Sequence, residues 1–411
     1  MQTNQAFSNV LISACLCALI GCGGGDDGPA APPDASPPTS VTLTGHAILR
    51  ATTFALGPSS GAELGSDAIN GQSLPFESQP VQGLSALVRD PSDDTGETYL
   101  ALVDNGYGSR DNSADFYLRV YRIRPDLRTA EAGSGDIEVL SFFDLRDPDQ
   151  RVEFPITDQA SAERKLTGAD FDPESLQVAA NGDLWIGDEF GPYVLHFNQY
   201  GVLLDAPIAL PADLAEPGPV GAGTSGTGFQ GMALSSDGAT LWPIRASADE
   251  LEWHLYEFDI ASRQYTGVRH RYPLAEVGHR VGALVMLDDT TGLAIEHDTT
   301  EATLSGYKRV HEITLVSPDQ PVTKRELIDL SEIADPERVG VGAEGDVGVG
   351  GAVFGLPFAA IGGLVVLDDA RVGVMTDNNF PFGQGRSAGS LDDTEFVVLA
   401  LPEPLSASAS R

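Results

Sequence analysis

The sequence predicts an all-β protein, a β-propeller of four-stranded antiparallel blades, with five blades readable along the chain and a sixth possible. Three observations support this: short apolar runs bounded by turn residues, repetition of these runs in groups, and few apolar patterns with a helical period. The chain has 46 Gly and 27 Pro among its 411 residues, which suits many short strands joined by turns. Its hydrophobic content of 42% is that of a globular protein.

The clearest unit is residues 168–204. Residues 175–179 read as a strand, and Asn181-Gly182 supplies the positive φ angles of a two-residue hairpin turn. Residues 183–187 form a second strand and residues 193–197 a third, and a short return strand is expected after Gly201. Carboxylates stand at the ends of these strands, so the unit is an antiparallel meander with acids at its edges.

The same arrangement recurs four more times along the chain. The sequence predicts first, second and third strands at 83–88, 99–104 and 117–123; at 229–234, 241–245 and 253–260; at 281–287, 292–297 and 310–316; and at 361–367, 372–377 and 395–401. Fourth strands are expected at 137–143, 264–272 and 324–330. Repetition of this kind favours a propeller over a β-sandwich or two small β domains.

The spacing of the units is uneven. Glu174 and Gln230 are 56 residues apart, and Gln230 and Gly282 are 52 apart, whereas 90 residues separate Leu84 from Glu174 and 81 separate Gly282 from Gly363. The longer gaps hold either long loops or a degenerate sixth blade. The last unit lacks its own fourth strand, and residues 41–49 are expected to supply it and close the ring, which removes exposed sheet edges.

The N-terminus reads as a targeting segment rather than as part of the fold. Residues 10–21 are apolar but too short to span a bilayer, and they end in Leu19-Ile20-Gly21-Cys22, which resembles the lipobox of bacterial lipoproteins. That resemblance implies lipidation of Cys22, although no Lys or Arg precedes the apolar run and an ordinary secretory signal is the alternative. We expect a lipoprotein signal peptide at 1–21, a Gly/Pro/Asp-rich tether at 22–40, the propeller at 41–402 and a disordered tail at 403–411.

This reading predicts a protein of the bacterial cell envelope, an outer-membrane lipoprotein attached to the membrane through its lipid anchor alone. Gly23 follows the cysteine in place of the aspartate that often marks retention in the inner membrane. The three cysteines are Cys15, Cys17 and Cys22, so the predicted mature domain has no disulfide. The net charge of −36 argues against nucleic-acid binding and repels an anionic substrate unless metal ions intervene.

Five phrases of the sequence resemble the phytase-like family, also described as "esterase-like activity of phytase". They are GLSAL at 83–87, DPESL with WIGDEFGPYVLHF at 172–197, GFQGMALSSDGATLW at 228–242, ALVMLDD with AIEHD at 283–298, and IGGLVVLDD with TDNNFPF and DDTEFVVLAL at 361–401. The resemblance covers most of the chain from about Gly45 onward. It implies a β-propeller, export, and hydrolysis of a phosphate ester or another ester. The third and fifth units depart from the pattern, with Gln230 and Gly363 where an acid is expected.

Acidic residues recur at equivalent places in the units, and equivalent places of successive blades converge on one face of a propeller. The predicted metal ligands are Asp104, Glu174, Asp188, Glu296, Asp298 and Asp377. Calcium prefers six to eight oxygen ligands, so the expected cofactor is a divalent cation, with calcium the first choice. Taken one pair at a time, such residues are also ordinary turn formers, so the prediction depends on their recurrence.

The predicted catalytic residues are Glu174, Asp188, Glu189 and Arg245. Arg245 and Arg280 are the candidate contacts for an anionic substrate, because a guanidinium forks onto phosphate or carboxylate; a salt bridge to a nearby acid is the alternative for Arg245. His297 is a candidate general acid or base, but a histidine between two outward carboxylates is expected to point to the opposite face of the strand and pack.

Three functions remain open from the sequence. The first is a metal-dependent hydrolase of phosphate monoesters or related esters, with a small anionic ester as substrate. The second is a non-catalytic surface propeller that binds a ligand or partner. The third is a lactonase-type propeller enzyme with one axial metal, which requires three or four ligands within coordination distance.

Overall fold

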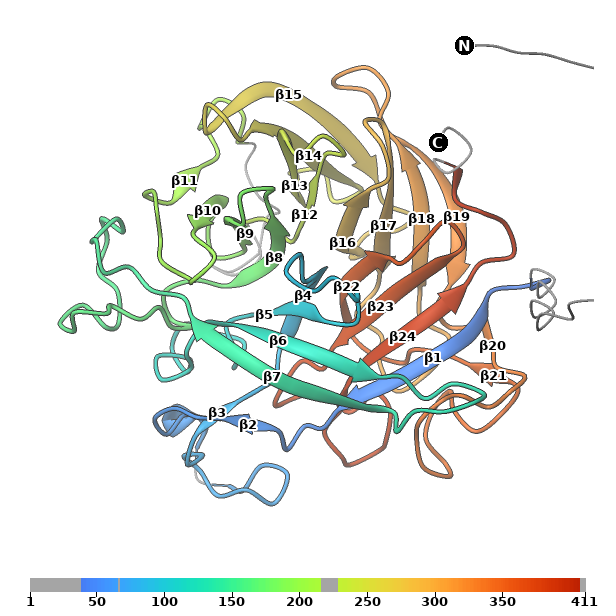
Figure 1. The fold of residues 1–411 in the computed structure, drawn as a ribbon. Coiled ribbons are helices and arrows are strands. Elements are labelled where there is room, and N and C mark those ends of the chain that lie inside the picture. Colours follow the sequence, from blue (N-terminus) through green and yellow to red (C-terminus); the bar gives the residue numbers. More distant parts are fainter. Residues whose placement is uncertain (1–37, 66, 216–227, 407–411) are drawn as a thin grey trace, which may run out of the picture. The chain divides into compact units, whose positions relative to one another are not determined.

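The computed structural model describes residues 38–65, 67–215 and 228–406, and these residues form a β-propeller of five blades (Figure 1). The predicted signal peptide, Cys22 and most of the predicted tether lie outside the described residues, as do residues 407–411 of the predicted tail. Within the described part, no helix has the length and apolarity needed to cross a membrane.

Each blade is a four-stranded antiparallel meander. Blade 1 contains β4 (Leu84–Arg89), β5 (Tyr99–Val103), β6 (Arg119–Asp126) and β7 (Asp136–Asp144); blade 2 contains β8 (Pro173–Val178), β9 (Leu184–Asp188), β10 (Tyr193–Phe197) and β11 (Ile208–Ala209); blade 3 contains β12 (Gly231–Leu234), β13 (Thr240–Ala246), β14 (Glu252–Asp259) and β15 (Gln264–Pro273). Blade 4 contains β16 (Arg280–Met286), β17 (Thr291–His297), β18 (Lys308–Thr314) and β19 (Thr323–Asp329).

Blade 5 is completed from the other end of the chain. It contains β22 (Ala360–Val366), β23 (Arg371–Asp377) and β24 (Thr394–Ala400), and β1 (Thr42–Leu49) pairs antiparallel with β24 along its whole length. The predicted closing strand is therefore confirmed. A single parallel pair, Ile48 with Asp136, also joins β1 to β7 of blade 1.

The two long gaps between units hold loops and short ladders. The described residues there contain β20 (Ile333–Ala334) paired with β21 (Val353–Phe354), and no sixth four-stranded sheet. Near the N-terminal side lie β2 (Phe54–Ala55), β3 (Gln79–Pro80) and the 3₁₀ turn Ala62–Leu64. The predicted return strand after Gly201 forms only isolated bridges, such as Phe197 with Leu203, and β11 takes the fourth place in blade 2.

The inner strands form a closed ring, because β4, β8, β12, β16 and β22 each contact the next and β22 contacts β4 (Figure 1). The ring is tight, and glycines make it possible. A methyl group at Gly362 would overlap the carbonyl oxygen of Ser85 on β4, and one at Gly282 would overlap that of Ile361 on β22. Glycine at Gly282 and Gly362 therefore lets the backbones of blades 4, 5 and 1 approach closely.

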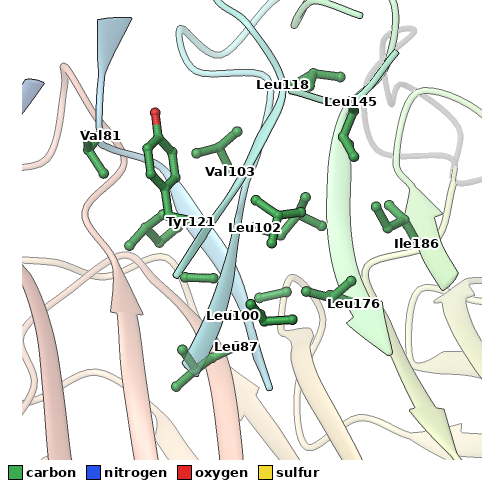
Figure 2. Close-up of a cluster of buried hydrophobic side chains, with 14 of the residues drawn as sticks. Val81, Leu87, Leu100, Leu102, Val103, Leu118, Tyr121, Leu145, Leu176 and Ile186 are labelled. Carbon is green, nitrogen blue, oxygen red and sulfur yellow. The ribbon is translucent and has the colours of Figure 1, made fainter. Parts of the chain in front are cut away.

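Apolar side chains fill the interfaces between blades. The largest cluster extends from blade 5 through blade 1 to blade 2, and Figure 2 shows part of it. It includes Met375 of blade 5, Leu87 and Leu102 of blade 1, and Leu176 and Ile186 of blade 2. Three further clusters include side chains of blades 2 and 3, 3 and 4, and 4 and 5. Burial on both faces explains why the inner strands are continuous apolar runs in the sequence.

Candidate functional site

A cavity of about 270 Å³ lies where the five inner strands begin and the second strands end. All five blades contribute to its lining. The lining residues are Ser85, Asp104, Asn105, Gly108, Asp172, Glu174, Glu189, Gln230, Arg280, Gly282, His297, Thr299, Ala359, Ala360, Ile361, Gly362, Asp377 and Asn379. Further residues of the five inner strands line a second cavity of about 210 Å³.

A recurring β-bulge aims one residue of the inner strand into the cavity. The pairing register shifts between Leu84 and Ala86, between Pro173 and Ser175, between Val281 and Ala283, and between Ala360 and Gly363. A bulge re-aims the side chain of the extra residue. The corresponding residues of blades 1 to 5 are Ser85, Glu174, Gln230, Gly282 and Gly362, which we call the bulge position, and all five line the cavity.

A second set of cavity residues stands at the end of each second strand. Ser175, the residue after the bulge in blade 2, pairs with Gly187, and Glu189 lies two residues further on. In blades 1, 4 and 5 the residues that pair with the residue after the bulge are Leu102, Ile295 and Met375. Two residues beyond them in the chain are Asp104, His297 and Asp377. We call this the strand-end position. These four residues line the cavity, and Ala246 holds the position in blade 3.

The inner-strand residue opposite the strand-end position forms a third set, which we call the flanking position. In blade 2 the carbonyl oxygen of Asp172 accepts from the backbone N–H of Glu189. In blade 4 Arg280 pairs with His297 across the ladder, and in blade 5 Ala360 pairs with Asp377. Blade 2 thus has an acid at all three positions, Asp172, Glu174 and Glu189. In the same three positions blade 4 has Arg280, Gly282 and His297.

The carboxylates of blade 2 lie close enough to share a cation. One oxygen from each of Asp172, Glu174 and Glu189 lies within 4.8 Å of the others. Asp104 and Asp377 from the neighbouring blades line the same cavity, together with the amide side chains of Asn105 and Asn379. The arrangement is a set of hard oxygen donors around one cavity.

Burial and mutual repulsion disfavour the ionised forms of these acids. Burial, and then the charges of Asp172 and Glu189, raise the pKa of Glu174 well above its ordinary value. Burial followed by Asp377 does the same to the pKa of Asp104, and burial followed by Glu189 to that of Asp172. Burial raises the pKa of Glu189 against the opposing charge of Arg280. Burial also raises the pKa of Asp377.

Local hydrogen bonds hold the acids in place. The backbone N–H of Asn105 donates to Asp172 Oδ1 at 3.1 Å, and its side-chain amide donates to Oδ2 at 2.8 Å. Backbone N–H groups also donate to Asp104 Oδ1 from Gly106 at 2.7 Å and to Asp377 Oδ1 from Asn379 at 2.8 Å. The bonds from Asn105 join blade 1 to blade 2, whereas the other two hold Asp104 and Asp377 within their own blades.

The wall formed by blade 4 has a different character. Arg280 is the one Lys or Arg among the described residues that line the cavity. His297 is buried, and its Nδ1–H donates to the carbonyl oxygen of Asp298 at 2.9 Å. The expectation that this histidine packs on the opposite face of its strand is wrong, because its strand-end position is that of Asp104 and Glu189.

Asp188, Glu296 and Arg245 do not line the cavity, contrary to the expectation that they face it. Each stands one residue before the strand-end position of its blade, and one residue along a strand reverses the direction of the side chain. Asp188 accepts the backbone N–H groups of Asp172 at 2.7 Å and Gly191 at 2.9 Å, and burial raises its pKa to about 7. Arg245 is buried within blade 3.

Glu296 and Asp298 stabilise the structure around the site instead of lining it. Glu296 accepts from the Ala275 backbone N–H at 2.7 Å and pairs with Lys324 at 2.5 Å. Asp298 forms an ion pair with Lys308 and accepts from the Tyr307 backbone N–H at 3.0 Å. Glu296 and Asp298 stand on either side of His297 in the sequence. The prediction turned the two carboxylates toward the cavity and the histidine away from it, whereas the structure has the reverse.

Of the predicted site residues, Asp104, Glu174, Glu189, Arg280 and Asp377 line the cavity. Asn105, Asp172 and Asn379, which accompany the recurring acids in the sequence, also line it, and so does Ser85, which the sequence did not single out. Asp172 carried a usable signal, because it precedes Glu174 by two residues in the strongest motif of the chain. The bulge that turns the Glu174 side chain toward the same cavity cannot be recognised from the residue types of the inner strand.

The fold and the cavity define a five-bladed propeller with an acidic, oxygen-rich mouth. The family model described as "Phytase-like: Esterase-like activity of phytase" matches residues 79–380. The chain therefore belongs to the phytase-like family. No curated protein matches this chain.

Solved structures similar to this chain are distant in sequence. A luciferin-regenerating enzyme has a TM-score of 0.37 at 10% identity, covering 87% of this chain and 94% of its own. A putative gluconolactonase has a TM-score of 0.34 at 13% identity, with 89% and 94% covered. Virginiamycin B lyase from Staphylococcus aureus has a TM-score of 0.34 at 10% identity, with 78% and 95% covered.

Proposed function

We propose that this protein is an exported, lipid-anchored hydrolase that uses a divalent cation to cleave phosphate monoesters or related esters. Membership of the phytase-like family supports the reaction class. The observation that carries the proposal is the division of one cavity, with three carboxylates of blade 2 within 4.8 Å of one another and Arg280 and His297 on blade 4.

The residues of the cavity fit a hard divalent cation. Asp172, Glu174 and Glu189 would hold it, with Asp104, Asp377 and the nearby amide oxygens available to complete an oxygen shell of the kind calcium prefers. A positive ion there would also relieve the repulsion that raises the pKa values of Asp172 and Glu174. When bound, the cation would attract the anionic ester and withdraw charge from it.

The chain's own residues would bind and orient the substrate. Arg280 stands at the mouth with an exposed side chain and would donate to the phosphoryl oxygens. Gln230 at the bulge position of blade 3, between the acidic and basic walls, offers an amide donor to the same group. Carboxylates that the cation leaves unneutralised would repel the charged group of a substrate, so this group would lie between the cation and Arg280 of blade 4.

Binding and turnover with the purified protein test the proposal. Calorimetric titration with Ca²⁺, Mg²⁺, Mn²⁺ and Zn²⁺ should show binding that Glu174→Gln weakens, with the exposed Glu77→Gln as the matched control. Hydrolysis of p-nitrophenyl phosphate should depend on the cation and be lost on chelation. Absence of turnover of every phosphate monoester and carboxylic ester tried, with each cation present, would refute a catalytic role; a cation that raises only Tm would favour a non-catalytic binding propeller.

A lactonase-type reaction is the second candidate, favoured by the three carboxylates of blade 2 within 4.8 Å of one another. A neutral lactone does not need Arg280, whereas a phosphate dianion does. Loss of phosphatase activity in Arg280→Ala therefore supports the first reaction. Faster turnover of a lactone than of any phosphate ester, unaffected by that substitution, identifies the second.

Anchoring through Cys22 is a separate part of the proposal and rests on the resemblance of residues 19–22 to a lipobox. Metabolic labelling with a fatty-acid analogue should mark the wild-type protein and leave Cys22→Ser unmarked. An unlabelled wild-type protein in a bacterial host would contradict lipidation. Fractionation of the envelope then tests the proposed outer-membrane location.

A further inference from the structure

Blade 4 presents a histidine where blades 1, 2 and 5 present acids. His297 occupies the strand-end position held by Asp104, Glu189 and Asp377. Its partner across the strand pair is Arg280, where blade 2 has Asp172. Because blade 4 has basic residues where blade 2 has acids, the blade 2 wall of the cavity suits a cation and the blade 4 wall suits an anion.

The hydrogen bond of His297 determines which ring nitrogen faces substrate. Nδ1 lies 2.9 Å from the carbonyl oxygen of Asp298. A carbonyl oxygen only accepts, so Nδ1 carries a proton and donates. In the neutral ring Nε2 then bears the lone pair. Bonds of this kind at one nitrogen set the role of the other.

Gly282 leaves room for that nitrogen. A Cβ atom at residue 282 would lie 3.0 Å from His297 Nε2, closer than a side-chain carbon ordinarily approaches. Both residues line the cavity. The glycine at the bulge position therefore keeps the Nε2 edge of the ring uncovered, whereas the equivalent residue of blade 2, Glu174, fills its position with a carboxylate.

The residues on either side of His297 hold its backbone. Glu296 binds the Ala275 N–H, and its carboxylate lies 2.9 Å from His279 Nδ1. Asp298 binds the Tyr307 N–H and pairs with Lys308. Two loops are thus tied to the strand on both sides of the histidine, and the ring is held in place before substrate binds, which is the condition for efficient proton transfer.

The surroundings keep the ring neutral. Burial, with further contributions from Lys308 and Arg280, lowers the pKa of His297 to about 4. A dianionic substrate beside Arg280 would offset these positive charges and favour the imidazolium as it forms. At neutral pH the ring is therefore unprotonated at Nε2 before substrate binds.

We propose that His297 is a catalytic residue that accepts through Nε2 the proton of the attacking water. The water oxygen forms a bond to phosphorus, the bond between phosphorus and the leaving oxygen breaks, and the imidazolium returns the proton to that oxygen. Atoms and charge balance with water as the only co-reactant. This inference rests on the proposed hydrolysis and adds its proton acceptor.

A role as a fourth ligand of the blade 2 acids is less well supported. Among the described residues, the group with ligand atoms within 4.8 Å of one another contains Asp172, Glu174 and Glu189, without His297. The histidine stands instead on blade 4, beside Arg280. Space for water and a phosphoryl group between the two walls is what the proposed step requires.

The test compares two buried histidines, each 4% exposed. His297→Gln should lower kcat by roughly 100-fold to 10,000-fold, the range for general acid–base groups, with KM and cation affinity within a few-fold of wild type. His196→Gln is the matched control: its ring stacks on Trp185 and contacts Asp183 and Asp205, away from the cavity lining. Its kcat should stay at the wild-type value.

Two further measurements separate chemistry from structure. Imidazole added to His297→Gly should restore part of the rate, which a purely structural defect would not allow. In ¹⁵N-labelled wild-type protein without cation, the His297 ring should show a protonated Nδ1 and a bare Nε2, and inorganic phosphate with Ca²⁺ should shift the Nε2 signal.

The outcomes distinguish the inference from its foundation. A wild-type enzyme that hydrolyses phosphate monoesters while His297→Gln keeps its kcat overturns the role of His297 alone. A protonated Nε2 with a bare Nδ1 overturns it as well. Failure of the wild-type protein to hydrolyse any ester overturns both the proposed function and this step.

Discussion

Replacing Glu174 with Gln should change the stability of the protein in opposite directions without and with a divalent cation. Glu174 lies within 4.8 Å of both Asp172 and Glu189, measured between carboxylate oxygens. Without a cation its charge opposes folding, and with a cation bound as we propose it would be a ligand. The substitution keeps the size and shape of the side chain and removes only the charge.

The magnitude follows from the geometry. Two unit charges at the 4.8 Å limit repel by about 3.5 kcal/mol at an effective dielectric constant of about 20. Glu174 has two such neighbours, so full ionisation would cost about 7 kcal/mol. Protonating it at pH 7 from its ordinary value of 4.5 costs only about 3.4 kcal/mol. Glu174 is therefore protonated rather than ionised in the folded protein without a cation. Its replacement by Gln should raise the free energy of unfolding at pH 7 by no more than about 3 kcal/mol.

The dependence on pH has a definite sign. A carboxyl whose pKa is raised by folding keeps more protons in the folded state, so folding is favoured at low pH. The penalty appears as pH rises above about 4.5, the unfolded value, and grows toward neutrality. Without cation, wild-type stability should therefore fall across this window, and Glu174→Gln should fall less steeply.

Thermal unfolding followed by circular dichroism measures the effect. At pH 7 with chelator, Glu174→Gln should unfold up to about 4 °C above wild type, by the usual scaling of Tm with free energy for a domain of this size. With saturating Ca²⁺ the order should reverse, because the wild type gains the binding free energy. Glu77→Gln, at an exposed site, should match wild type in both conditions. A lower Tm for Glu174→Gln in chelator would refute the electrostatic account.

Three further predictions concern other parts of the molecule. Arg280→Ala should weaken inorganic phosphate binding in the presence of cation by roughly 10-fold to 100-fold, the range for a charge-assisted hydrogen bond, measured by calorimetry; unchanged affinity would remove Arg280 from the anion site. Glu395→Gln should cost about 3–5 kcal/mol, as expected when one partner of a buried ion pair is lost. Glu395 accepts from Arg386 Nε at 2.8 Å and Nη2 at 2.6 Å, and its carboxylate lies 3.1 Å from His46 Nε2. Burial raises the pKa of Glu395, but Arg386 and His46 together lower it from 4.5 to about 2. The Glu395 carboxylate therefore stabilises the fold above about pH 4.5, and this contribution is lost as the pH falls toward 2. Urea unfolding of both proteins at pH 7 and pH 3 checks this, and the same loss of unfolding free energy at both pH values would contradict it. Gly362→Ala should cost roughly 1–3 kcal/mol through overpacking against the Ser85 carbonyl oxygen, whereas Gly351→Ala, with no heavy atom nearer than 3.7 Å to the added carbon, should cost little; equal Tm values for the two variants would show that the ring of inner strands has slack.

The fold could be predicted from the sequence because strand patterns and turn residues repeat locally. The unit at residues 168–204 has a hairpin dipeptide and three alternating or apolar runs, and the structure places β8, β9 and β10 on them. Ring closure by β1 was also predictable, since the last unit was one strand short. The blade count was harder, because loops of variable length interrupt the repeat.

The site was only partly predictable because a one-residue register decides which side chain faces the cavity. Asp188 and Glu189 are adjacent and chemically alike, yet only Glu189 lines the cavity. The bulge that brings Glu174 into the mouth inserts one residue into the inner strand, and residue type does not reveal it. For the same reason His297 lines the cavity and Glu296 does not, although the sequence favoured the opposite arrangement.

The pairing of β1 with β24 has a consequence for how the chain reaches its folded state. Thr42 lies opposite Ala400, so the first strand of the propeller must find the last, and such distant contacts form slowly. Until then β24 presents an open edge that another chain can extend. Newly synthesised molecules at high concentration should therefore aggregate through blade 5, and a chaperone that covers this edge would raise the yield of folded protein.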